Sequence, residues 1–227
     1  MNEDELKEPR GSDILYQKAL RNETLFRRPE LSPGFRVERI EMTPPADGEL
    51  MRRVQGGDRE AFSTLVERHN APLVRFLTVL SRDRDRAEEV AQDAFVRLFE
   101  LSHLYQERGQ FTPYLYRIAA NLLRTEDRKR RRRAILLKAF GGNGTCEAAP
   151  SPQTVCLQDE LSVRLSEALS ALPLRYRSPL VLRDVEGWSY ADIARAMSCG
   201  EGTVKSRIHR GRERLRRRLE PYWNGGL

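Results

Sequence analysis

Cations recur along residues 203–219 at a spacing suited to binding a polyanion. This stretch holds one acidic residue, Glu213, and eight cations: Lys205, Arg207, Arg210, Arg212, Arg214, Arg216, Arg217 and Arg218. Its apolar and small residues recur every three or four positions, at Val204, Ile208, Gly211, Leu215 and Leu219. That period predicts an α-helix with one buried face, which leaves the cations on the solvent side. Because so dense a charge repels itself unless a polyanion is near, we expect this helix to bind nucleic acid.

A short helix and a turn precede this basic helix. Ser189 can cap a helix that begins at Tyr190, and Gly200 permits a tight turn before the basic helix begins at Glu201. This pattern is typical of a helix-turn-helix, whose second helix enters the major groove of DNA. The alternative is an arginine-rich helix that is merely a solvated face. The capped helix and the glycine turn favour DNA binding.

Aromatic and basic side chains alternate in a second region, residues 102–133. A polar loop, SHLYQERGQF, leads into a helix that we expect to start near Thr112 and Pro113. Its core stripe is Phe111, Leu115, Ile118, Ala119 and Leu122, and the residues away from that stripe are Tyr116, Arg117, Asn121, Arg124 and Arg128. Aromatics interleaved with cations beside a loop can stack unpaired bases while holding the nucleic-acid backbone. The alternative is that Tyr114 and Tyr116 are ordinary core or boundary aromatics.

The helix predicted over residues 87–101 carries apolar groups on both sides. Its core side is Ala87, Val90, Ala91, Ala94, Phe95, Leu98 and Leu101. Val96 and Phe99 project on the opposite side with Glu89 and Gln92, and Asp93 lies at the margin. Exposed apolar groups rimmed by polar ones commonly mark a protein contact, so this strip suggests a partner helix. Equally, Phe99 can pack under a loop of its own domain.

No arrangement of cysteine, histidine or carboxylate predicts catalysis. The three cysteines, Cys146, Cys156 and Cys199, form no C-x-x-C pair and lack a histidine at zinc spacing. A DNA-processing enzyme such as a recombinase needs a nucleophile or clustered metal-binding carboxylates, and the acids here lie on charged helix faces. We therefore expect no catalytic residue, no metal site and no cofactor.

Length and composition predict two small all-α domains joined by a flexible linker. The chain has 227 residues, a net charge of +7 and 32% charged residues. No stretch of eighteen apolar residues exists to enter a membrane and the acidic start is no signal peptide, so we expect a cytoplasmic protein. Residues 1–48 carry a charge of −2, which leaves +9 on the remainder. The excess of positive charge therefore lies outside residues 1–48.

The expected boundaries follow composition. Residues 1–48 form a flexible extension, 49–134 a first domain, 135–158 a linker that includes GGNGTCEAAPSPQTVC, and 159–221 a second domain. Asp58 can cap one helix of the first domain, and Asp83 lies where another should begin. We expect four short helices in the second domain, one of which can start at Ser178 and Pro179.

These segments resemble a known family in sequence order. The stretch LSALPLRYRSPLVLRDVEGWSYADIARAMSCGEGTVKSRIHRGRERLRRRL resembles region 4 of the extracytoplasmic-function (ECF) sigma factors of the sigma-70 family. GDREAFSTLVERHNAPLVRFL, DRAEEVAQDAFVRLFE and FTPYLYRIAANLL resemble their region 2. The resemblance covers about residues 50–220. It implies a promoter-specificity subunit of bacterial RNA polymerase, whereas an ordinary repressor or activator would share only the helix-turn-helix.

The resemblance also implies roles for individual residues. Contacts to the −35 promoter element are implied for Thr203, Lys205, Ser206, Arg207, His209 and Arg210. Promoter opening and binding of the −10 element are implied for His103, Tyr105, Gln106, Tyr114, Arg117, Asn121, Arg124 and Arg128. Binding of core polymerase is implied for Glu89, Gln92, Asp93, Phe95, Val96 and Phe99.

The implied partners are the clamp coiled coil and the flap of core polymerase, double-stranded and melted promoter DNA, and an anti-sigma factor. The sequence departs from the family at two positions in the −10 region. Tyr114 stands where tryptophan is most frequent, and Thr125 stands where an acid is usual. We therefore expect the contacts of this chain with the −10 element to differ in detail from those of the family.

Overall fold

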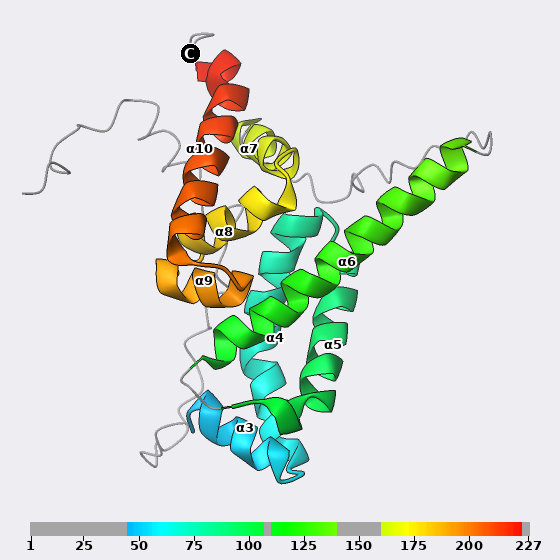
Figure 1. Ribbon diagram of the computed structural model, residues 1–227, viewed down its shortest axis with the longest axis vertical. Coiled ribbons are helices and arrows are strands. Elements are labelled where there is room, and N and C mark those ends of the chain that lie inside the picture. The colour runs from blue at the N-terminus through cyan, green and yellow to red at the C-terminus, as the bar shows by residue number, and fades with distance from the viewer. Residues whose placement is uncertain (1–44, 107–109, 140–159, 224–227) are drawn as a thin grey trace, which may run out of the picture.

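A computed structural model describes residues 45–106, 110–139 and 160–223, and these residues are helical without any strand. The all-α prediction is therefore confirmed. The elements in chain order are α3 (Asp47–Gln55), α4 (Arg59–Ser81), α5 (Arg84–Glu100), the 3-10 turn η1 (Ser102–Leu104), α6 (Phe111–Ala139), α7 (Glu160–Ser170), α8 (Leu174–Asp184), α9 (Tyr190–Met197) and α10 (Glu201–Trp223) (Figure 1). In this part of the chain, no helix has the length and apolar character needed to cross a membrane.

Side chains cap the helices where the sequence predicts. The Asp58 carboxylate accepts hydrogen bonds from the backbone N–H groups of Glu60 and Ala61, at 2.9 and 3.0 Å. Asp83 accepts from the N–H of Arg86 at 3.1 Å, and the Ser189 hydroxyl accepts from the N–H of Asp192 at 3.1 Å. Each cap satisfies backbone donors that the first helical turn leaves unpaired.

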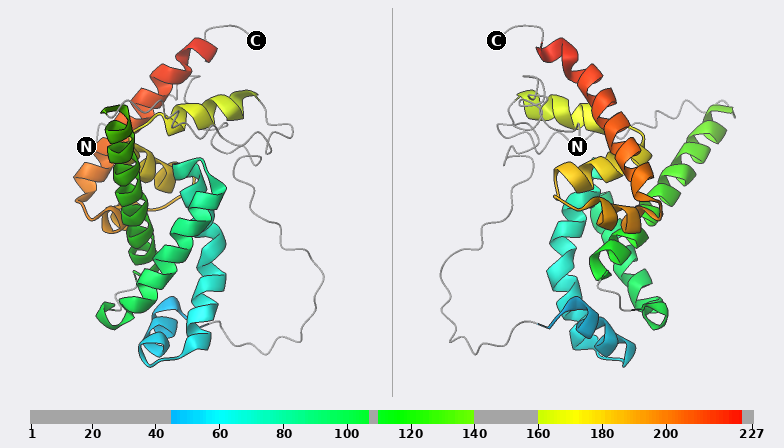
Figure 2. Two further views of the ribbon diagram at one scale, coloured as in Figure 1. Left: turned by 90° about the vertical axis from the view of Figure 1, so that its right-hand side faces the viewer. Right: turned by 60° about the vertical axis from the view of Figure 1, so that its left-hand side comes forward.

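The first module comprises α3 to α6. Helices α4, α5 and α6 pack along one another and α3 crosses one end of α4, as Figures 1 and 2 show. Its core is filled by fully buried side chains, among them Leu65, Leu73, Phe76, Leu77, Val90, Leu98, Leu115 and Leu123. Helix α6 continues to Ala139, into the residues expected to begin the linker, and its C-terminal part projects beyond the module (Figure 1).

The second module comprises α7 to α10, four helices as expected. The predicted stripe of α10 is confirmed, because Val204, Ile208, Gly211, Leu215 and Leu219 are all buried. The prediction of a helix start at Ser178 and Pro179 is wrong: α8 begins at Leu174 and contains Pro179. The Ser178 hydroxyl does not cap a helix but donates to the Leu174 carbonyl one turn earlier, at 3.0 Å. The linker residues 140–158 and the extension up to residue 44 lie outside the described residues.

At Gly211, α10 lies close against α8. A Cβ atom at this position would lie 3.0 Å from Leu180 Cδ1 and 3.4 Å from the Tyr176 carbonyl oxygen. At Gly202, on the same helix, a Cβ would meet nothing within 4 Å. The close approach of the two helices therefore requires glycine at 211 but not at 202.

We expect Gly211→Val to lower the free energy of unfolding by about 1–3 kcal/mol, because the added methyl groups force α8 and α10 apart. The matched control is Gly202→Val, which adds the same side chain to α10 in open space. Chemical denaturation of both variants measures the difference. Equal stability of the two would contradict the close packing of α8 on α10.

Candidate nucleic-acid interface

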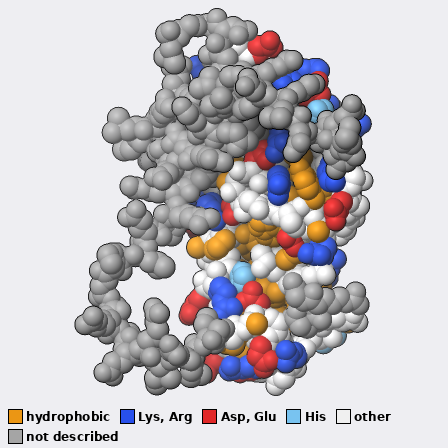
Figure 3. Space-filling view, turned by 90° about the vertical axis from the view of Figure 1, so that its left-hand side faces the viewer, with side chains coloured by type: hydrophobic (Ala, Val, Ile, Leu, Met, Phe, Trp, Pro, Cys, Tyr) orange, Lys and Arg blue, Asp and Glu red, His pale blue; other side chains and the backbone are white. Residues whose placement is uncertain are grey.

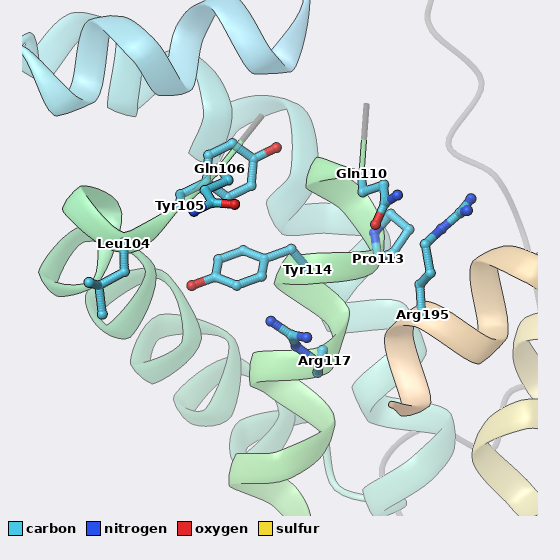
Figure 4. Close-up of a pocket in the computed structure, with 8 residues that line it drawn as sticks. All are labelled: Leu104, Tyr105, Gln106, Gln110, Pro113, Tyr114, Arg117 and Arg195. Atoms are coloured by element: carbon cyan, nitrogen blue, oxygen red, sulfur yellow. The ribbon is translucent and has the colours of Figure 1, made fainter. Parts of the chain in front are cut away.

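A cavity of about 290 Å³ opens where the loop after η1 meets the start of α6. Figure 4 shows the eight side chains that line it: Leu104, Tyr105, Gln106, Gln110, Pro113, Tyr114, Arg117 and Arg195. Four of these, Tyr105, Gln106, Tyr114 and Arg117, are among the residues predicted to bind the −10 element. The other four were not predicted as binding residues, although Leu104, Gln110 and Pro113 lie in or beside the loop that the sequence singled out. Arg195 comes from α9 of the second module, which thus forms one wall of the cavity.

Two aromatic rings and a guanidinium define the chemistry of this pocket. The ring of Tyr105 is buried, and its centroid lies 5.2 Å from that of the half-buried Tyr114. The Arg117 guanidinium lies 5.0 Å from the centroid of the Tyr114 ring, within the range of a cation–π interaction. The pocket therefore combines an aromatic surface, a positive charge and two amide side chains, Gln106 and Gln110. Such a set can stack a planar base and hydrogen-bond its edge.

Contacts from α3 and α4 hold the pocket in place. The Gln55 side-chain amide donates to the carbonyl oxygens of Ser102 and Tyr105, both at 2.9 Å, and so ties the loop to α3. Behind Tyr105, Phe111 packs at 6.3 Å between ring centroids, and His69 packs on Phe111 at 4.9 Å. Sequence reasoning missed Gln55 because it lies 50 residues from the carbonyl that it binds.

The neighbouring Asp47 fixes the orientation of His69. His69 Nε2 lies 2.9 Å from a carboxylate oxygen of Asp47, which would favour the charged ring. Burial acts in the opposite direction and is the larger effect, so the pKa of His69 is lowered.

The remaining predicted −10 residues lie outside the pocket. His103 is exposed in η1, and Asn121, Arg124 and Arg128 are exposed farther along α6. The Arg124 guanidinium donates to the Asn121 side-chain oxygen at 3.2 Å. Residues 121, 124 and 128 follow steps of three and four, so they share one face of the helix.

Tyr116 is not on the outer side of α6, so that expectation is wrong and the alternative, a core aromatic, is confirmed for this residue. Its ring is buried between Phe76 of α4 and Trp188 of the second module, with centroid distances of 5.0 and 4.7 Å. Desolvation on burial raises the pKa of Tyr116. The two tyrosines of α6 therefore differ, since Tyr114 lines the pocket and Tyr116 belongs to the core.

The start of α10 presents an outward polar surface. Of the residues predicted to bind the −35 element, Thr203, Lys205, Ser206, His209 and Arg210 are exposed. Arg207 is half-buried, and its guanidinium contacts the Cys199 sulfur at 3.6 Å. Figure 3 shows charged side chains of both signs on the side of the molecule where α9 and α10 lie, with apolar side chains between them.

Two arginines farther along α10 contribute to the fold. The Arg212 guanidinium pairs with the Asp184 carboxylate of α8, at 3.0 and 2.5 Å, and this carboxylate is buried. Arg214 lies over the Tyr176 ring, 4.8 Å from its centroid. These two cations bind α8, so only part of the positive charge of α10 is available to a polyanion.

The outer face of α5 combines acidic, polar and apolar groups. Glu89, Gln92 and Asp93 are exposed, and Val96 and Phe99 are 58% and 45% exposed. The Phe99 ring packs edge-on against Phe62, with centroids 5.1 Å apart, yet keeps nearly half of its surface open. Phe95 lies on the other side of the helix, only 5% exposed, and packs in the core. The predicted polymerase-binding set is thus brought together except for Phe95.

Comparisons with known proteins identify the family of the two modules. The family model for sigma-70 region 2 matches residues 65–133, and that for sigma-70 region 4 matches residues 162–215. The chain is 34% identical over 187 residues to the RNA polymerase sigma-H factor of Pseudomonas aeruginosa, covering 79% of this chain and 97% of that protein. It is 31% identical over 182 residues to the ECF RNA polymerase sigma-E factor of Escherichia coli K12, covering 77% and 95%.

Two solved structures have a similar fold. The sigma factor RpoE of Bartonella quintana, solved with the anti-sigma factor NepR, is 26% identical with a TM-score of 0.57, and the match covers 70% of this chain and 96% of that one. CnrH, solved with the cytosolic domain of CnrY, shares the fold at 24% identity and a TM-score of 0.57, covering 78% and 99%.

The first module thus corresponds to region 2 and the second to region 4, and the relatives match over nearly their whole length. Members of this family are transcription initiation factors, not enzymes. The chain belongs to the ECF sigma factors of the sigma-70 family, which bind core RNA polymerase and recognise promoters.

Proposed function

We propose that this sigma factor reads the −10 element with the pocket of the first module and the −35 element with α10 of the second. The observation that carries the proposal is the cavity in which Tyr114 and Arg117 face a loop held by Gln55. A flipped base of the −10 element stacks on Tyr114, and the amides of Gln106 and Gln110 contact its edge. The pocket supports this use because it offers both a ring face and hydrogen-bonding groups.

This chain opens a promoter by binding bases that have left the duplex, and this binding requires no catalytic group. Taking a base out of the duplex costs a few kcal/mol, and stacking on an aromatic side chain returns about 1–3 kcal/mol per base. Arg124 and Arg128 continue from Arg117 along α6, over about 16 Å at 1.5 Å per residue. We propose that Asn121 and these arginines hold the strand that leaves the pocket, while His103 contacts it from η1.

Recognition of the −35 element falls to the exposed start of α10. Thr203, Lys205, Ser206, His209 and Arg210 reach base edges and phosphates, and Arg207 reaches them after leaving Cys199. The buried contacts of Val204 and Ile208 support this proposal because they fix the rotation of the helix. Cations at the start of such a helix serve both sequence readout and phosphate binding.

Core polymerase docks on the outer face of α5. Val96 and Phe99 supply the apolar contact, Glu89, Gln92 and Asp93 supply the polar rim, and Phe95 supports the face from the core. We assign this face to the clamp coiled coil and a surface of the second module to the flap. The chain then acts in the cytoplasm, where the polymerase works.

An anti-sigma factor is proposed as the regulator of this chain. RpoE of Bartonella quintana, which shares its fold and 26% of its sequence, was solved with such a protein. Recovery of a tagged copy of the chain from growing cells, with the bound proteins identified by mass spectrometry, tests both partners at once.

The pocket is tested by Tyr114→Ala, with Tyr114→Phe as the matched control that keeps the ring. We expect the alanine variant to lose about tenfold in open-complex formation, because one stacked base is worth about 1–3 kcal/mol. Permanganate footprinting of unpaired thymines on promoter DNA, with holoenzyme, measures opening. Opening by Tyr114→Ala at the level of Tyr114→Phe would contradict the role of this ring.

The recognition helix is tested by the double variant Lys205→Ala and Arg210→Ala. We expect promoter-specific binding by holoenzyme to weaken by at least tenfold, since each specific contact to a base is worth about 1–3 kcal/mol. The variant Arg216→Ala and Arg218→Ala removes the same charge farther along α10 and should weaken all DNA binding only modestly. Promoter fragments and scrambled fragments are compared at one salt concentration. If both double variants keep the same selectivity, the assignment of the recognition residues is wrong.

The polymerase face is tested by combining Glu89→Arg with Phe99→Ala. We expect affinity for core polymerase to fall by about 30-fold or more, as for loss of an interface hot spot of about 2 kcal/mol. The control combines Glu67→Arg on α4 with Leu136→Ala on α6, two exposed positions that match the change in charge and apolar area. Circular dichroism checks the fold of both. Unchanged affinity of the first variant for core polymerase would refute the docking face.

A further inference from the structure

The acidic residues of α6 lie together where the helix leaves the first module. In its sequence the only acids are Glu126 and Asp127, and they follow Leu123, the last buried residue among the described side chains of this helix. Cations surround them, because Arg124 and residues 128–133, which are all arginine or lysine, are exposed. This part of α6 projects beyond the module (Figure 1). Two carboxylates therefore interrupt a dense run of positive charge.

A single guanidinium from α5 binds both carboxylates. Arg86 Nε donates to a carboxylate oxygen of Glu126 at 3.2 Å, and Arg86 Nη2 donates to one of Asp127 at 2.7 Å. The Arg86 side chain is 11% exposed, whereas those of Glu126 and Asp127 are 35% and 31% exposed. The planar fork of arginine suits two acceptors at once, and the single ammonium group of lysine does not.

Local structure fixes Arg86 in this place. It lies in the first turn of α5, where its backbone N–H donates to the Asp83 cap at 3.1 Å. The next residue, Ala87, is fully buried, and so is Val90 one turn later. These buried residues set the rotation of α5, and with that rotation the Arg86 side chain extends to α6.

Without Arg86, the two acids have other cations within reach on their own helix. Asp127 is three residues after Arg124 and four before Arg131. Glu126 is four residues before Arg130. Opposite charges at these spacings attract each other on a helix surface, most strongly when the acid comes first.

Pairs with this spacing form elsewhere in the chain. Arg84 pairs with Glu88 on α5, and Glu213 pairs with Arg217 on α10, each four residues apart. In the described part of α6, by contrast, the two acids pair with the guanidinium of α5. The cations of the projecting segment are therefore not neutralised by the acids beside them.

We propose that Arg86 is a positioning residue for DNA binding: by holding both acids of α6, it keeps Arg124 and residues 128–133 free to bind phosphates. Arg86 acts through these cations and does not contact the DNA. The inference rests on the proposed use of Arg124 and Arg128 to hold the strand that leaves the pocket. It adds that their availability depends on a side chain of another helix.

A purely structural role for Arg86 is the alternative, in which it only ties α5 to α6. The two roles differ in one consequence. Removal of the two acids cannot repair the loss of a tie, because the helices stay unconnected at this point. Removal of the acids does repair a loss of free cations, because nothing is then left to neutralise them.

Counterion release sets the size of the expected effect. For single strands the logarithm of the binding constant falls with the logarithm of the salt concentration, with a slope of about −0.7 per phosphate contact. One contact is therefore worth about fivefold in affinity at about 0.1 M salt. Loss of Arg86 frees two carboxylates, so we expect the loss of one to two contacts.

The first test compares Arg86→Gln with Arg84→Gln in the full chain. Residue 84 lies two positions before Arg86 and so faces another side of α5. Its replacement removes the same charge from the same turn and frees Glu88 instead. Fluorescence anisotropy measures binding of a labelled 20-nucleotide single strand of mixed sequence over a range of salt concentrations.

We expect Arg86→Gln to bind the strand at least about fivefold more weakly than Arg84→Gln at about 0.1 M salt. The salt slope should be smaller by about 0.7 to 1.4, the value for one to two phosphate contacts. Equal affinities and slopes of the two variants would overturn the proposal.

The second test combines Arg86→Gln with Glu126→Gln and Asp127→Asn. This triple variant lacks the guanidinium and also both acids, so the cations of α6 have no carboxylate beside them. We expect its affinity and salt slope to return at least to the wild-type values. A folded triple variant that binds as weakly as Arg86→Gln would show that Arg86 is only a tie between helices.

The control for this rescue combines Arg84→Gln with Asp85→Asn and Glu88→Gln. It has the same net charge as the first triple variant, but its changes lie on α5. We expect a smaller gain over Arg84→Gln than the rescue gives over the corresponding single variant. An equal gain in the two series would assign the rescue to net charge and overturn the proposal.

Circular dichroism checks the fold of every variant. If Arg86→Gln lowers the helical content, Arg86→Lys replaces it, with Arg84→Lys as its control. Lysine keeps the charge but does not bind both carboxylates as the arginine fork does, so we expect a smaller loss in the same direction. Equal affinities of the folded Arg86→Lys and Arg84→Lys variants would overturn the proposal.

The strand-holding role itself is tested in the same assay by combining Arg124→Ala with Arg128→Ala. If this variant binds as tightly as wild type, the proposed use of these arginines is wrong, and the role of Arg86 is wrong with it. If it binds more weakly while Arg86→Gln matches Arg84→Gln, the role of Arg86 alone is refuted.

Discussion

Helix α6 must bury one side in the core of the first module while its other side stays available to nucleic acid. Leu115, Ala119 and Leu123 are fully buried and fix the rotation of the helix about its axis. With the rotation fixed, Tyr114 and Arg117 line the pocket. In the proposed use of this pocket, the ring and the guanidinium are in place before a base arrives, which reduces the entropy lost when the base binds.

The same helix also provides the contact between the modules. Tyr116 follows Tyr114 by two residues and so points elsewhere, between Phe76 and Trp188. Trp188 of the second module therefore packs against a buried residue of the first module.

Local patterns predicted several helix caps and the buried stripe of α10, because these depend on neighbours in the sequence, but they placed the start of α8 wrongly. The caps at Asp58, Asp83 and Ser189 and the stripe from Val204 to Leu219 follow from spacing alone. Contacts between distant segments were not predictable in this way. The contact of Gln55 depends on how α3 packs against the loop after η1, and the positions of Arg195 and Tyr116 depend on how the two modules pack. Local spacing does not predict either arrangement.

The central claim is that this chain directs core polymerase to promoters through two separate elements. The most direct measurement is transcription of genomic fragments by core RNA polymerase with and without the chain, followed by sequencing of the RNA 5′ ends. The account predicts new start sites that depend on the chain and share two upstream sequence elements at a constant spacing. Absence of new start sites, or new sites without such shared elements, would contradict it.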